Sequence, residues 1–273
     1  MKVLIYKNVE KDVKDICINT LIEQLSINKI EYEVLRDADL QSNFNADALF
    51  SIGGDGTILF LSEFAKRNAI PIIGINAGKL GFLCEFERKD IKDAVEYLVN
   101  NKFIKDRRLM LKIAYHNKIF YALNDVYIQR AYENASGNMV ADISVIIDDA
   151  LVTRYKGDGA IVSSPTGSTA YSFSLGGPLV SPHTAAFIVT PIAAHSFNQR
   201  PIVYSAGSTC ELKIADKTKV GVFIDGKLSL QLDQNDSIKI SCAEKPVTFL
   251  RRENYNFFMK LTDKLNNKGG FNE

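Results

Sequence analysis

The chain has 273 residues, of which 46% are hydrophobic and 24% charged, the proportions of a globular protein with a full core. This length exceeds the usual size of a single domain, so two domains are expected. The 33 basic and 32 acidic residues leave a net charge of +1, which argues against a dedicated nucleic-acid or membrane-surface protein. The sequence has neither an apolar run of membrane-spanning length nor a signal-peptide pattern, so a cytoplasmic protein without membrane partners is predicted.

The cysteines and histidines are scattered along the chain. None of them has the paired spacing that is typical of a zinc site or a redox couple. The cysteines are therefore interpreted as small buried or half-buried side chains, and no structural metal site is expected.

The first hundred residues alternate between predicted strands and predicted helices. Apolar periodicity gives these segments in chain order: 2–6, 9–28, 31–35, 48–52, 57–68, 70–75 and 89–101. Such alternation predicts a Rossmann-like α/β domain with a parallel sheet over residues 1–102. In such sheets ligands bind beyond the carboxyl ends of the strands, so Asp55 and the turn 76–79 are expected to face one cleft.

From residue 103 the pattern changes to short runs rich in β-branched and aromatic residues. The predicted strands are 109–115, 118–126, 140–147, 151–155, 187–189, 209–214, 220–224, 228–232, 237–242 and 247–250. Regular short strands separated by turns predict a mostly antiparallel, β-sandwich-like domain over residues 103–252. In the remaining stretch, 253–273, helical spacing over 255–265 predicts a helix that packs back on the N-terminal domain.

The stretch Gly53-Gly54-Asp55-Gly56-Thr57 separates the strand at 48–52 from a helix. A strand, a glycine turn and a helix place free backbone N–H groups and a positive helix end against a phosphate. A carboxylate at that point would repel the phosphate, so Asp55 is predicted to handle a proton or a metal while the glycines approach the phosphate. This is the chemistry of a phosphotransferase. The alternative is that Asp55 is a helix N-cap or turn residue.

A second polar cluster spans residues 157–172, where seven hydroxyl side chains surround Pro165 and Gly167. Pro and Gly enforce turns there, and a solvated loop could have the same composition. The cluster is followed by Leu175-Gly176-Gly177-Pro178 and preceded by Leu123-Asn124-Asp125-Val126.

Together, the segments 53–57, 123–126, 157–171 and 176–178 resemble the NAD kinase family, and the resemblance extends from the first strand to Leu250. The glycine turn alone is also found in lipid and sugar kinases, whereas the long stretch that ends at Tyr171 is much more specific. Members of this family phosphorylate the 2′-hydroxyl of the adenosine ribose of NAD to give NADP. The resemblance implies the family's two-domain fold, NAD and ATP or polyphosphate as substrates, and Mg²⁺ or another divalent metal with ATP. It also implies a homodimer or homotetramer.

The resemblance implies a role for each site residue. Asp55 is similar to the general base, and Gly54 and Gly56 would flank the path of the phosphate. Asn124 and Asp125 match a pair that holds hydroxyls or the nicotinamide side of NAD, with Asp125 in place of the commoner Glu. The remaining residues implied to contact the two nucleotide ends are Phe82, Lys156, Asp158, Thr166, Thr169, Ala170, Tyr171 and Ser174. A tyrosine can both stack on a base and form a hydrogen bond.

Other interpretations of these residues stay open. The pair 124–125 could be a turn at a strand end, Thr169 and Ser172 could be core-facing hydroxyls, and Phe82 could belong to the core. The sequence has no Gly-x-x-x-x-Gly-Lys-Ser/Thr loop, so conventional P-loop binding of ATP is not supported. A lipid or sugar kinase and a non-catalytic dinucleotide-binding protein are the competing functions.

Overall fold

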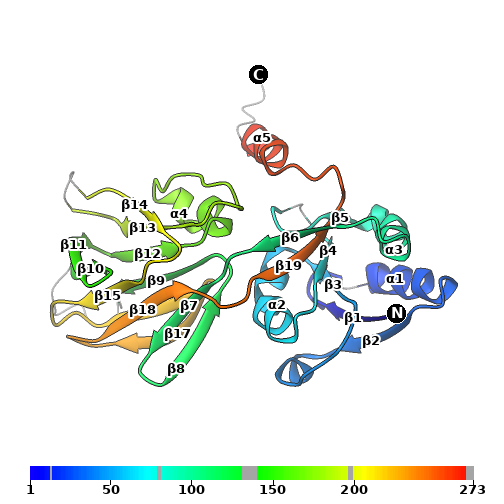
Figure 1. The fold of residues 1–273 in the computed structure, drawn as a ribbon, viewed down its shortest axis with the longest axis horizontal. Helices are drawn as coiled ribbons and strands as arrows, with labels where there is room; N and C mark the ends of the chain where they lie inside the picture. Colours follow the sequence, from blue (N-terminus) through cyan, green and yellow to red (C-terminus); the bar gives the residue numbers. More distant parts are fainter. Residues whose placement is uncertain (13, 79–80, 131–139, 196–198, 269–273) are drawn as a thin grey trace. The chain divides into compact units, whose positions relative to one another are not determined.

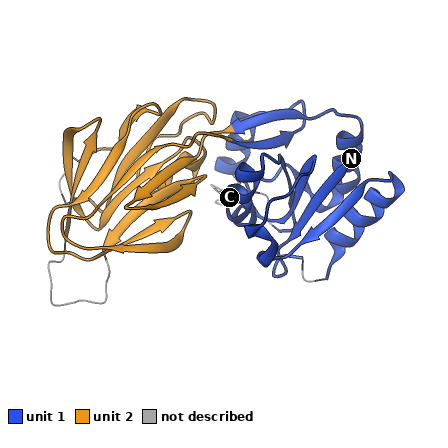
Figure 2. Ribbon diagram, turned by 60° about the horizontal axis from the view of Figure 1, so that its bottom comes forward, with its two compact units in different colours: residues 1–107, 247–273 blue, residues 108–246 orange. Residues whose placement is uncertain are grey.

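The computed structural model describes residues 1–12, 14–78, 81–130, 140–195 and 199–268, and the chain divides into two compact units (Figures 1 and 2). Unit 1 comprises residues 1–107 and 247–273, and unit 2 comprises residues 108–246. Two ends of the stretch predicted as the β-rich domain, 103–107 and 247–252, therefore fall in unit 1. The chain leaves unit 1 once and returns to it.

Unit 1 is built on a seven-stranded sheet with strand order β2-β1-β3-β4-β19-β6, and β5 pairs with β4. Its strands are β1 (Lys2–Lys7), β2 (Glu31–Leu35), β3 (Ala48–Gly53), β4 (Ile72–Asn76), β5 (Phe86–Glu87), β6 (Ile104–Arg108) and β19 (Val247–Arg251). The pairings of β1 with β2 and β3, of β3 with β4, and of β4 with β5 and β19 are parallel. The predicted N-terminal α/β architecture is confirmed.

The helices of unit 1 are α1 (Ile16–Ile27), α2 (Asp55–Asn68), α3 (Ile91–Val99) and α5 (Phe257–Lys268), with short 3₁₀ turns η1 (Asp37–Gln41) and η2 (Arg88–Asp90). α1 and α3 cover one face of the sheet and α2 covers the other. Val3, Phe50 and Ile75 point into one hydrophobic cluster with α1 and α3. Side chains alternate along a strand, so the buried Leu49 points to the other face, where α2 contacts β3, β4 and β19.

The predicted helix 9–28 begins later than its apolar spacing suggested. The carboxylate of Asp12 accepts the N–H groups of Cys17 (3.1 Å) and Ile18 (3.0 Å), which satisfies two donors of the first turn of α1. Asp15 directly before the helix has a left-handed backbone, with φ of 55°. The described residues directly before Ile16 therefore form a loop that caps the helix.

The strand order places a topological switch point between β1 and β3. The connection β1-α1-β2 leads toward one edge of the sheet, whereas β3-α2-β4 leads toward the other, with their helices on opposite faces. Ligands of open α/β sheets bind beyond the carboxyl ends of the strands at such a point. In this sheet, Asn8 follows the carboxyl end of β1, and the glycine turn follows that of β3. The two ends are linked, because the N–H of Asn8 donates to the carbonyl oxygen of Ile52 at 2.9 Å.

Unit 2 consists of two six-stranded antiparallel sheets (Figure 2). The first has the order β11-β10-β15-β18-β7-β8, and the second has the order β14-β13-β12-β9-β16-β17. Their strands are β7 (Leu111–Tyr115), β8 (Lys118–Ala122), β9 (Asp125–Arg130), β10 (Ala141–Ile147), β11 (Ala150–Gly157), β12 (Gly159–Ser163), β13 (Ala186–Ile192), β14 (Ile202–Ser205), β15 (Cys210–Ile214), β16 (Val220–Ile224), β17 (Lys227–Leu232) and β18 (Ser237–Cys242). Alternate residues of both sheets form a single core, so the predicted sandwich-like β architecture is confirmed.

The predicted strand 118–126 is wrong in one respect, because it is two strands. β8 ends at Ala122 and β9 starts at Asp125, and between them the carboxylate of Asp225 accepts the N–H groups of Leu123 and Asn124, each at 2.8 Å. A side chain about a hundred residues away thus takes the backbone donors that a continuous strand would have used.

Candidate active site

The glycine turn ends β3 and starts α2. Gly54 is the N-cap residue and Asp55 is the first helical residue, so the N-cap interpretation of Asp55 does not hold. The N–H groups of Thr57 and Ile58 bond the carbonyl of Gly54 at 3.0 and 3.3 Å. A Cβ added at Gly54 or Gly56 would meet nothing within 4 Å, so backbone in this turn is open to a ligand. The first turn of α2 can therefore offer N–H groups and its positive end to an anion.

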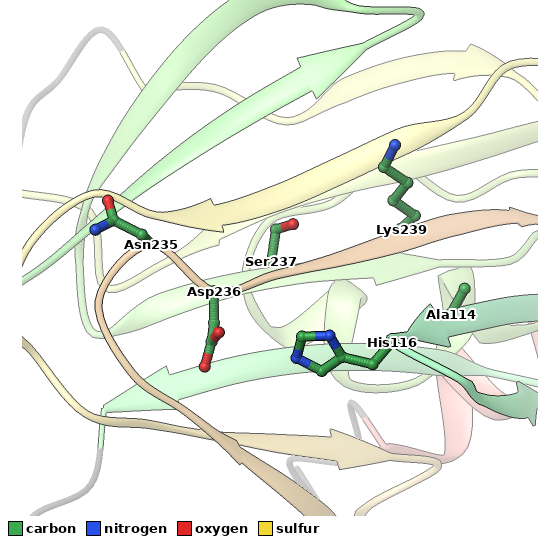
Figure 3. Close-up of a pocket in the computed structure, with 6 residues that line it drawn as sticks. All are labelled: Ala114, His116, Asn235, Asp236, Ser237 and Lys239. Atoms are coloured by element: carbon green, nitrogen blue, oxygen red, sulfur yellow. The ribbon is translucent and has the colours of Figure 1, made fainter.

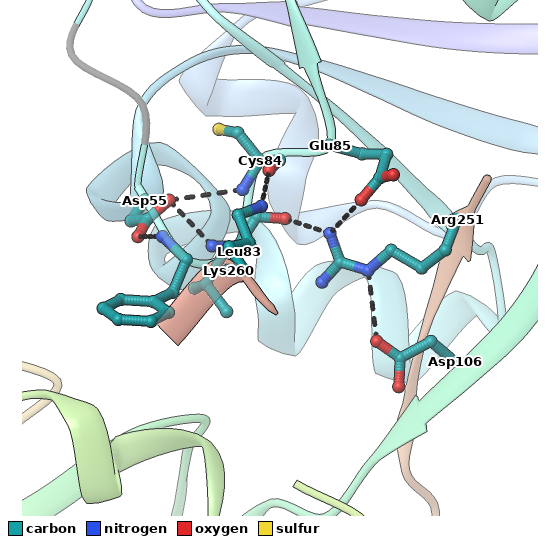
Figure 4. Close-up of polar contacts among 8 residues, drawn as sticks. Asp55, Leu83, Cys84, Glu85, Asp106, Arg251 and Lys260 are labelled. Atoms are coloured by element: carbon teal, nitrogen blue, oxygen red, sulfur yellow. Dashed lines mark hydrogen bonds and ion pairs between the residues drawn. The ribbon is translucent and has the colours of Figure 1, made fainter. Parts of the chain in front are cut away.

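The carboxylate of Asp55 bonds a backbone segment that follows β4 (Figure 4). Its Oδ2 accepts the N–H of Phe82 at 2.6 Å, and its Oδ1 accepts those of Leu83 at 3.0 Å and Cys84 at 3.3 Å. A Cβ added at Gly81 would lie 2.1 Å from the carboxylate atoms, so this approach requires glycine at position 81. The structure thus brings two predicted site residues, Asp55 and Phe82, together with both turn glycines.

The other end of this segment is fixed by a fully buried arginine. Arg251, the last residue of β19, donates from Nη1 to the carbonyl of Leu83 at 2.5 Å and lies 3.5 Å from Glu85. Its Nε lies 3.1 Å from Asp106, and both carboxylates are themselves buried. The guanidinium carbon lies 4.6 Å from the ring centroid of Phe249 and 4.8 Å from that of Tyr255, and the face of an aromatic ring attracts a cation.

The predicted turn after β4 borders a pocket. Asn76 closes the turn on itself, since its side chain donates to Gly78 O at 2.8 Å and accepts the N–H of Gly78 at 3.1 Å. The pocket at the turn measures about 470 Å³ and includes Arg88 and Lys89. Lys79 of the turn lies outside the described residues.

A separate cavity of about 260 Å³ lies in unit 2 (Figure 3). It is lined by Ala114, His116, Asn235, Asp236, Ser237 and Lys239, and none of them is a predicted site residue.

In unit 2 the pair Asn124 and Asp125 lies at the start of β9, on a loop held by Asp225. Asp125 is 4% exposed, and burial, then the charge of Asp225, raise its pKa to about 7. Burial likewise raises the pKa of Asp225 to about 6, although three backbone N–H groups and Lys227 lower it. With its raised pKa, the buried carboxyl group of Asp125 can therefore accept or donate a hydrogen bond near neutral pH.

The long hydroxyl-rich stretch packs against this loop. Gly167 lies so close that an added Cβ would be 2.1 Å from Asn124 O, and Ser164 donates its N–H to the same oxygen at 2.8 Å. Thr166 starts the 3₁₀ turn η3 (Thr166–Thr169) and is buried, with its hydroxyl 3.4 Å from Arg108. The structure thus brings the segments 124–125 and 164–169 together.

The short helix α4 (Tyr171–Ser174) continues this stretch. Tyr171 is half-buried, and its ring contacts the ring of Tyr127 edge-on, with the two centroids 5.2 Å apart. The ring of Tyr127 also stacks on that of Phe223, with a centroid distance of 4.7 Å. Ser174, at the end of the helix, is exposed. Ser172 is buried 3.4 Å from Thr190, so for this hydroxyl the core-facing interpretation is confirmed.

Lys156 and Asp158 lie away from these residues. Asp158 connects β11 to β12 and accepts from Arg130 Nε at 2.7 Å, while Lys156 is exposed 3.6 Å from Asp142. Arg130 ends β9, so five residues, or roughly 17 Å, separate it from Asp125 at the start of that strand. The structure therefore does not bring these two residues to the 124–125 loop of the same chain.

Sequence reasoning assigned no role to Gly81, Arg251 or Asp225. For Asp225 a local signal exists, because Asp225-Gly226 stands between two apolar runs and both residues have positive φ, 45° and 81°, as a tight hairpin turn requires. No local pattern marks Gly81 or Arg251, whose partners are distant in sequence.

Two negative findings concern the described part of the chain. No group of three or more His, Cys, Asp or Glu side chains in it could hold a metal ion. In the same residues, no helix is both long and apolar enough to cross a membrane.

Family models match most of the chain. One described as "ATP-NAD kinase N-terminal domain" matches residues 5–103, and one described as "ATP-NAD kinase C-terminal domain" matches residues 123–252. A curated relative named NAD kinase from Caldicellulosiruptor saccharolyticus is 30% identical, covering 97% of this chain and 99% of its own length. Another, from Sulfurimonas denitrificans, is 36% identical and covers 95% of this chain and 90% of its own length.

Two solved structures have the same fold. An NAD kinase from Archaeoglobus fulgidus in complex with ATP superposes with a TM-score of 0.80 at 28% identity, over 97% of this chain and 99% of its own. Yeast NADH kinase complexed with NADH superposes with a TM-score of 0.80 over 99% of this chain and 89% of its own. At 23% identity, this second likeness concerns the fold alone.

Proposed function

The chain belongs to the NAD kinase family and is an NAD kinase, and we propose that it transfers the γ-phosphoryl group of ATP to the 2′-hydroxyl of the adenosine ribose of NAD, with Asp55 as general base. The observation that carries the role of Asp55 is its carboxylate, fixed by three backbone N–H groups beside an open glycine turn. A lipid or sugar kinase and a non-catalytic binding protein are not favoured, because relatives covering nearly the whole chain are NAD kinases.

The arrangement suits a general base. A ribose hydroxyl is a poor nucleophile at neutral pH, and a carboxylate within hydrogen-bond reach can take its proton. A carboxylate offers about four lone-pair positions. Among the described residues, Phe82, Leu83 and Cys84 take three of these positions, two on Oδ1 and one on Oδ2. Oδ2, which accepts a single backbone N–H, is the oxygen that we propose takes the hydroxyl proton, in an orientation that the backbone has already fixed.

The turn around Asp55 serves the phosphoryl group. Gly54 and Gly56 leave the backbone accessible, so the transferred group can approach the first N–H groups of α2. Phosphoryl transfer needs chiefly positioning and neutralisation of charge, which these N–H groups supply without covalent participation.

Mg²⁺ usually binds to one or two carboxylates and to the phosphates of its nucleotide, so a metal that is carried by the donor needs no cluster of three protein ligands. The described residues contain no such cluster. When bound with ATP, the metal supplies charge neutralisation on the phosphates.

In unit 2 we assign the NAD contacts to the loop 124–125 and to the hydroxyl-rich stretch. Asp125, whose pKa burial raises to about 7, can hold vicinal ribose hydroxyls together with Asn124. The adenine side would be contacted by Thr166, Thr169, Ala170, Tyr171 and Ser174. A nucleotide contact of Phe82, which belongs to unit 1, stays a prediction. Lys156 and Asp158, at the far end of β9, would reach a dinucleotide from a second copy in a homodimer or homotetramer. A cytoplasmic location stays a prediction.

The test is a coupled assay of NADP formation from NAD and Mg-ATP, with Asp55→Asn beside the wild type. We expect the wild type to make NADP and Asp55→Asn to lose at least about 10²-fold in kcat, the smaller contribution of a general base. Asp93→Asn, an exposed carboxylate in the first turn of α3, is the matched control and should keep full activity. Repeating the assay with polyphosphate identifies the preferred donor. A wild type that binds NAD but forms no NADP would refute the proposed reaction.

A further inference from the structure

Three charged side chains from three different elements converge on the segment Phe82–Glu85 (Figure 4). Asp55 of α2 accepts its N–H groups, Arg251 of β19 donates to Leu83 O, and Lys260 of α5 donates from Nζ to Cys84 O at 2.5 Å. The segment between Gly81 and Glu85 belongs to no helix or strand, so its backbone groups depend on such partners.

Asp55 and Lys260 bind opposite ends of the same residue. The N–H of Cys84 donates to Asp55 at 3.3 Å, while its carbonyl accepts from Lys260. One turn earlier on α5, Phe257 lies with its ring centroid 6.5 Å from that of Phe82, whose N–H is the shortest donor to Asp55. Residues three apart lie on one helix face, so α5 holds the segment through an aromatic contact and a charged one.

The surroundings of Lys260 are strongly charged. It is half-buried and faces Asp55 from α2, Cys84 and Glu85 from the segment before β5, and Arg251 from β19. The ring of Tyr255 lies 5.9 Å from Nζ. Burial first, and then the charge of Arg251, lower the pKa of Lys260 to about 8, although Glu85, Asp55 and Cys84 raise it.

We propose that Lys260 is a positioning residue for Asp55: it fixes the peptide that orients the carboxylate and places a positive charge beside it. This inference rests on the proposed role of Asp55 as general base. An adjacent cation favours the ionised form of a carboxylate, which is the form that a base needs. The C-terminal helix is thereby part of the catalytic arrangement through a residue that does not touch substrate.

The experiment measures kcat and the KM for NAD from pH 6 to 9.5 in the wild type, Lys260→Met, Lys260→Arg and the control Lys264→Met on the same helix. We expect Lys260→Met to lower kcat about 10-fold, to leave the KM for NAD within about twofold, and to shift the acidic limb of the pH profile upward by about one unit. In the wild type, kcat should fall as the pH passes about 8, where Lys260 loses its charge. Lys260→Arg keeps its charge at every pH of the assay, so this alkaline decline should disappear.

Two outcomes overturn the inference. One is a Lys260→Met profile with the same kcat and the same acidic limb as Lys264→Met. The other is a Lys260→Arg profile with an unchanged alkaline limb, and this result also decides the matter if Lys260→Met does not fold.

The Asp55→Asn background separates this inference from the proposed function. If Asp55→Asn is inactive, adding Lys260→Met should lower the residual rate no further, because Lys260 acts through Asp55. A further 10-fold loss in the double variant refutes the positioning role while leaving the general base intact. If Asp55→Asn is fully active, the proposed role of Asp55 fails first.

Discussion

Gly81 is the position where one added methyl group should separate the proposed catalytic role of Asp55 from the stability of unit 1. In Gly81→Ala the new Cβ would lie 2.1 Å from Cγ and both oxygens of the Asp55 carboxylate. The φ of Gly81 lies outside the left-handed region, so this steric clash, and not backbone strain, causes the effect.

The size of the displacement follows from these contacts. Ordinary contact begins near 3.4 Å, so the carboxylate and residue 81 must move apart by about 1.3 Å. The same movement would lengthen the 2.6 Å bond from Phe82 to about 3.9 Å, beyond hydrogen-bond distance. A misplacement of about 1 Å can cost about 10²-fold in rate, and an unpaired buried donor about 1–3 kcal/mol in stability.

We therefore expect Gly81→Ala to lose about 10²-fold in kcat for NADP formation while the protein stays folded, with a reduction of about 1–3 kcal/mol in the free energy of unfolding measured with urea. Gly78→Ala is the matched control, since a Cβ at Gly78 meets nothing within 4 Å. If Gly81→Ala keeps kcat within about twofold of Gly78→Ala, the orientation of Asp55 by residues 82–84 does not matter for catalysis.

The remaining predictions concern buried charges. Because the pKa of Asp125 is raised to about 7, its carboxylate binds a proton more strongly in the folded state than in the unfolded state. The free energy of unfolding should therefore fall as the pH rises from about 4 to 7, by at most on the order of 4 kcal/mol. Asp125→Asn should flatten the dependence, as urea unfolding at pH 5 and 8 would reveal; an unchanged slope would assign the effect to Asp225 and contradict the prediction. Arg251→Met leaves two buried carboxylates without their guanidinium and should cost about 3–5 kcal/mol, whereas Arg252→Met, at a more exposed pair, should cost about 1 kcal/mol or less. Equal thermal unfolding of the two variants would refute this difference.

The C-terminal helix illustrates how well local patterns predict elements. Apolar spacing placed a helix at 255–265, and the structure has α5 at Phe257–Lys268. The alternation of strands and helices and the run of short strands likewise predicted both architectures, because side-chain periodicity reflects which face of an element is buried. The glycine turn was predictable for the same reason, since a short stretch of sequence contains all of its requirements.

Partners that lie far apart in sequence were not predictable. β19 returns from the end of the chain to pair in parallel with β4, although its residues read like any other short strand. Asp225 divides one predicted strand in two by taking backbone N–H groups about a hundred residues away. Backbone donors and acceptors are the same at every residue, so a sequence carries no mark of which distant side chain will satisfy them.

The sequence by itself determined the family and both architectures, and it led to the proposal of Asp55 as the centre of the site, because these depend on residue types at short fixed spacings. Only the tertiary structure decided how Asp55 is held. Its partners at 82–84 lie 27 to 29 residues away, and the side chains of Arg251 and Lys260 reach that segment across 168 and 176 residues. Such contacts form only when the sheet brings β4 and β19 together and α5 lies against the segment, so they are properties of the folded chain and not of any stretch within it.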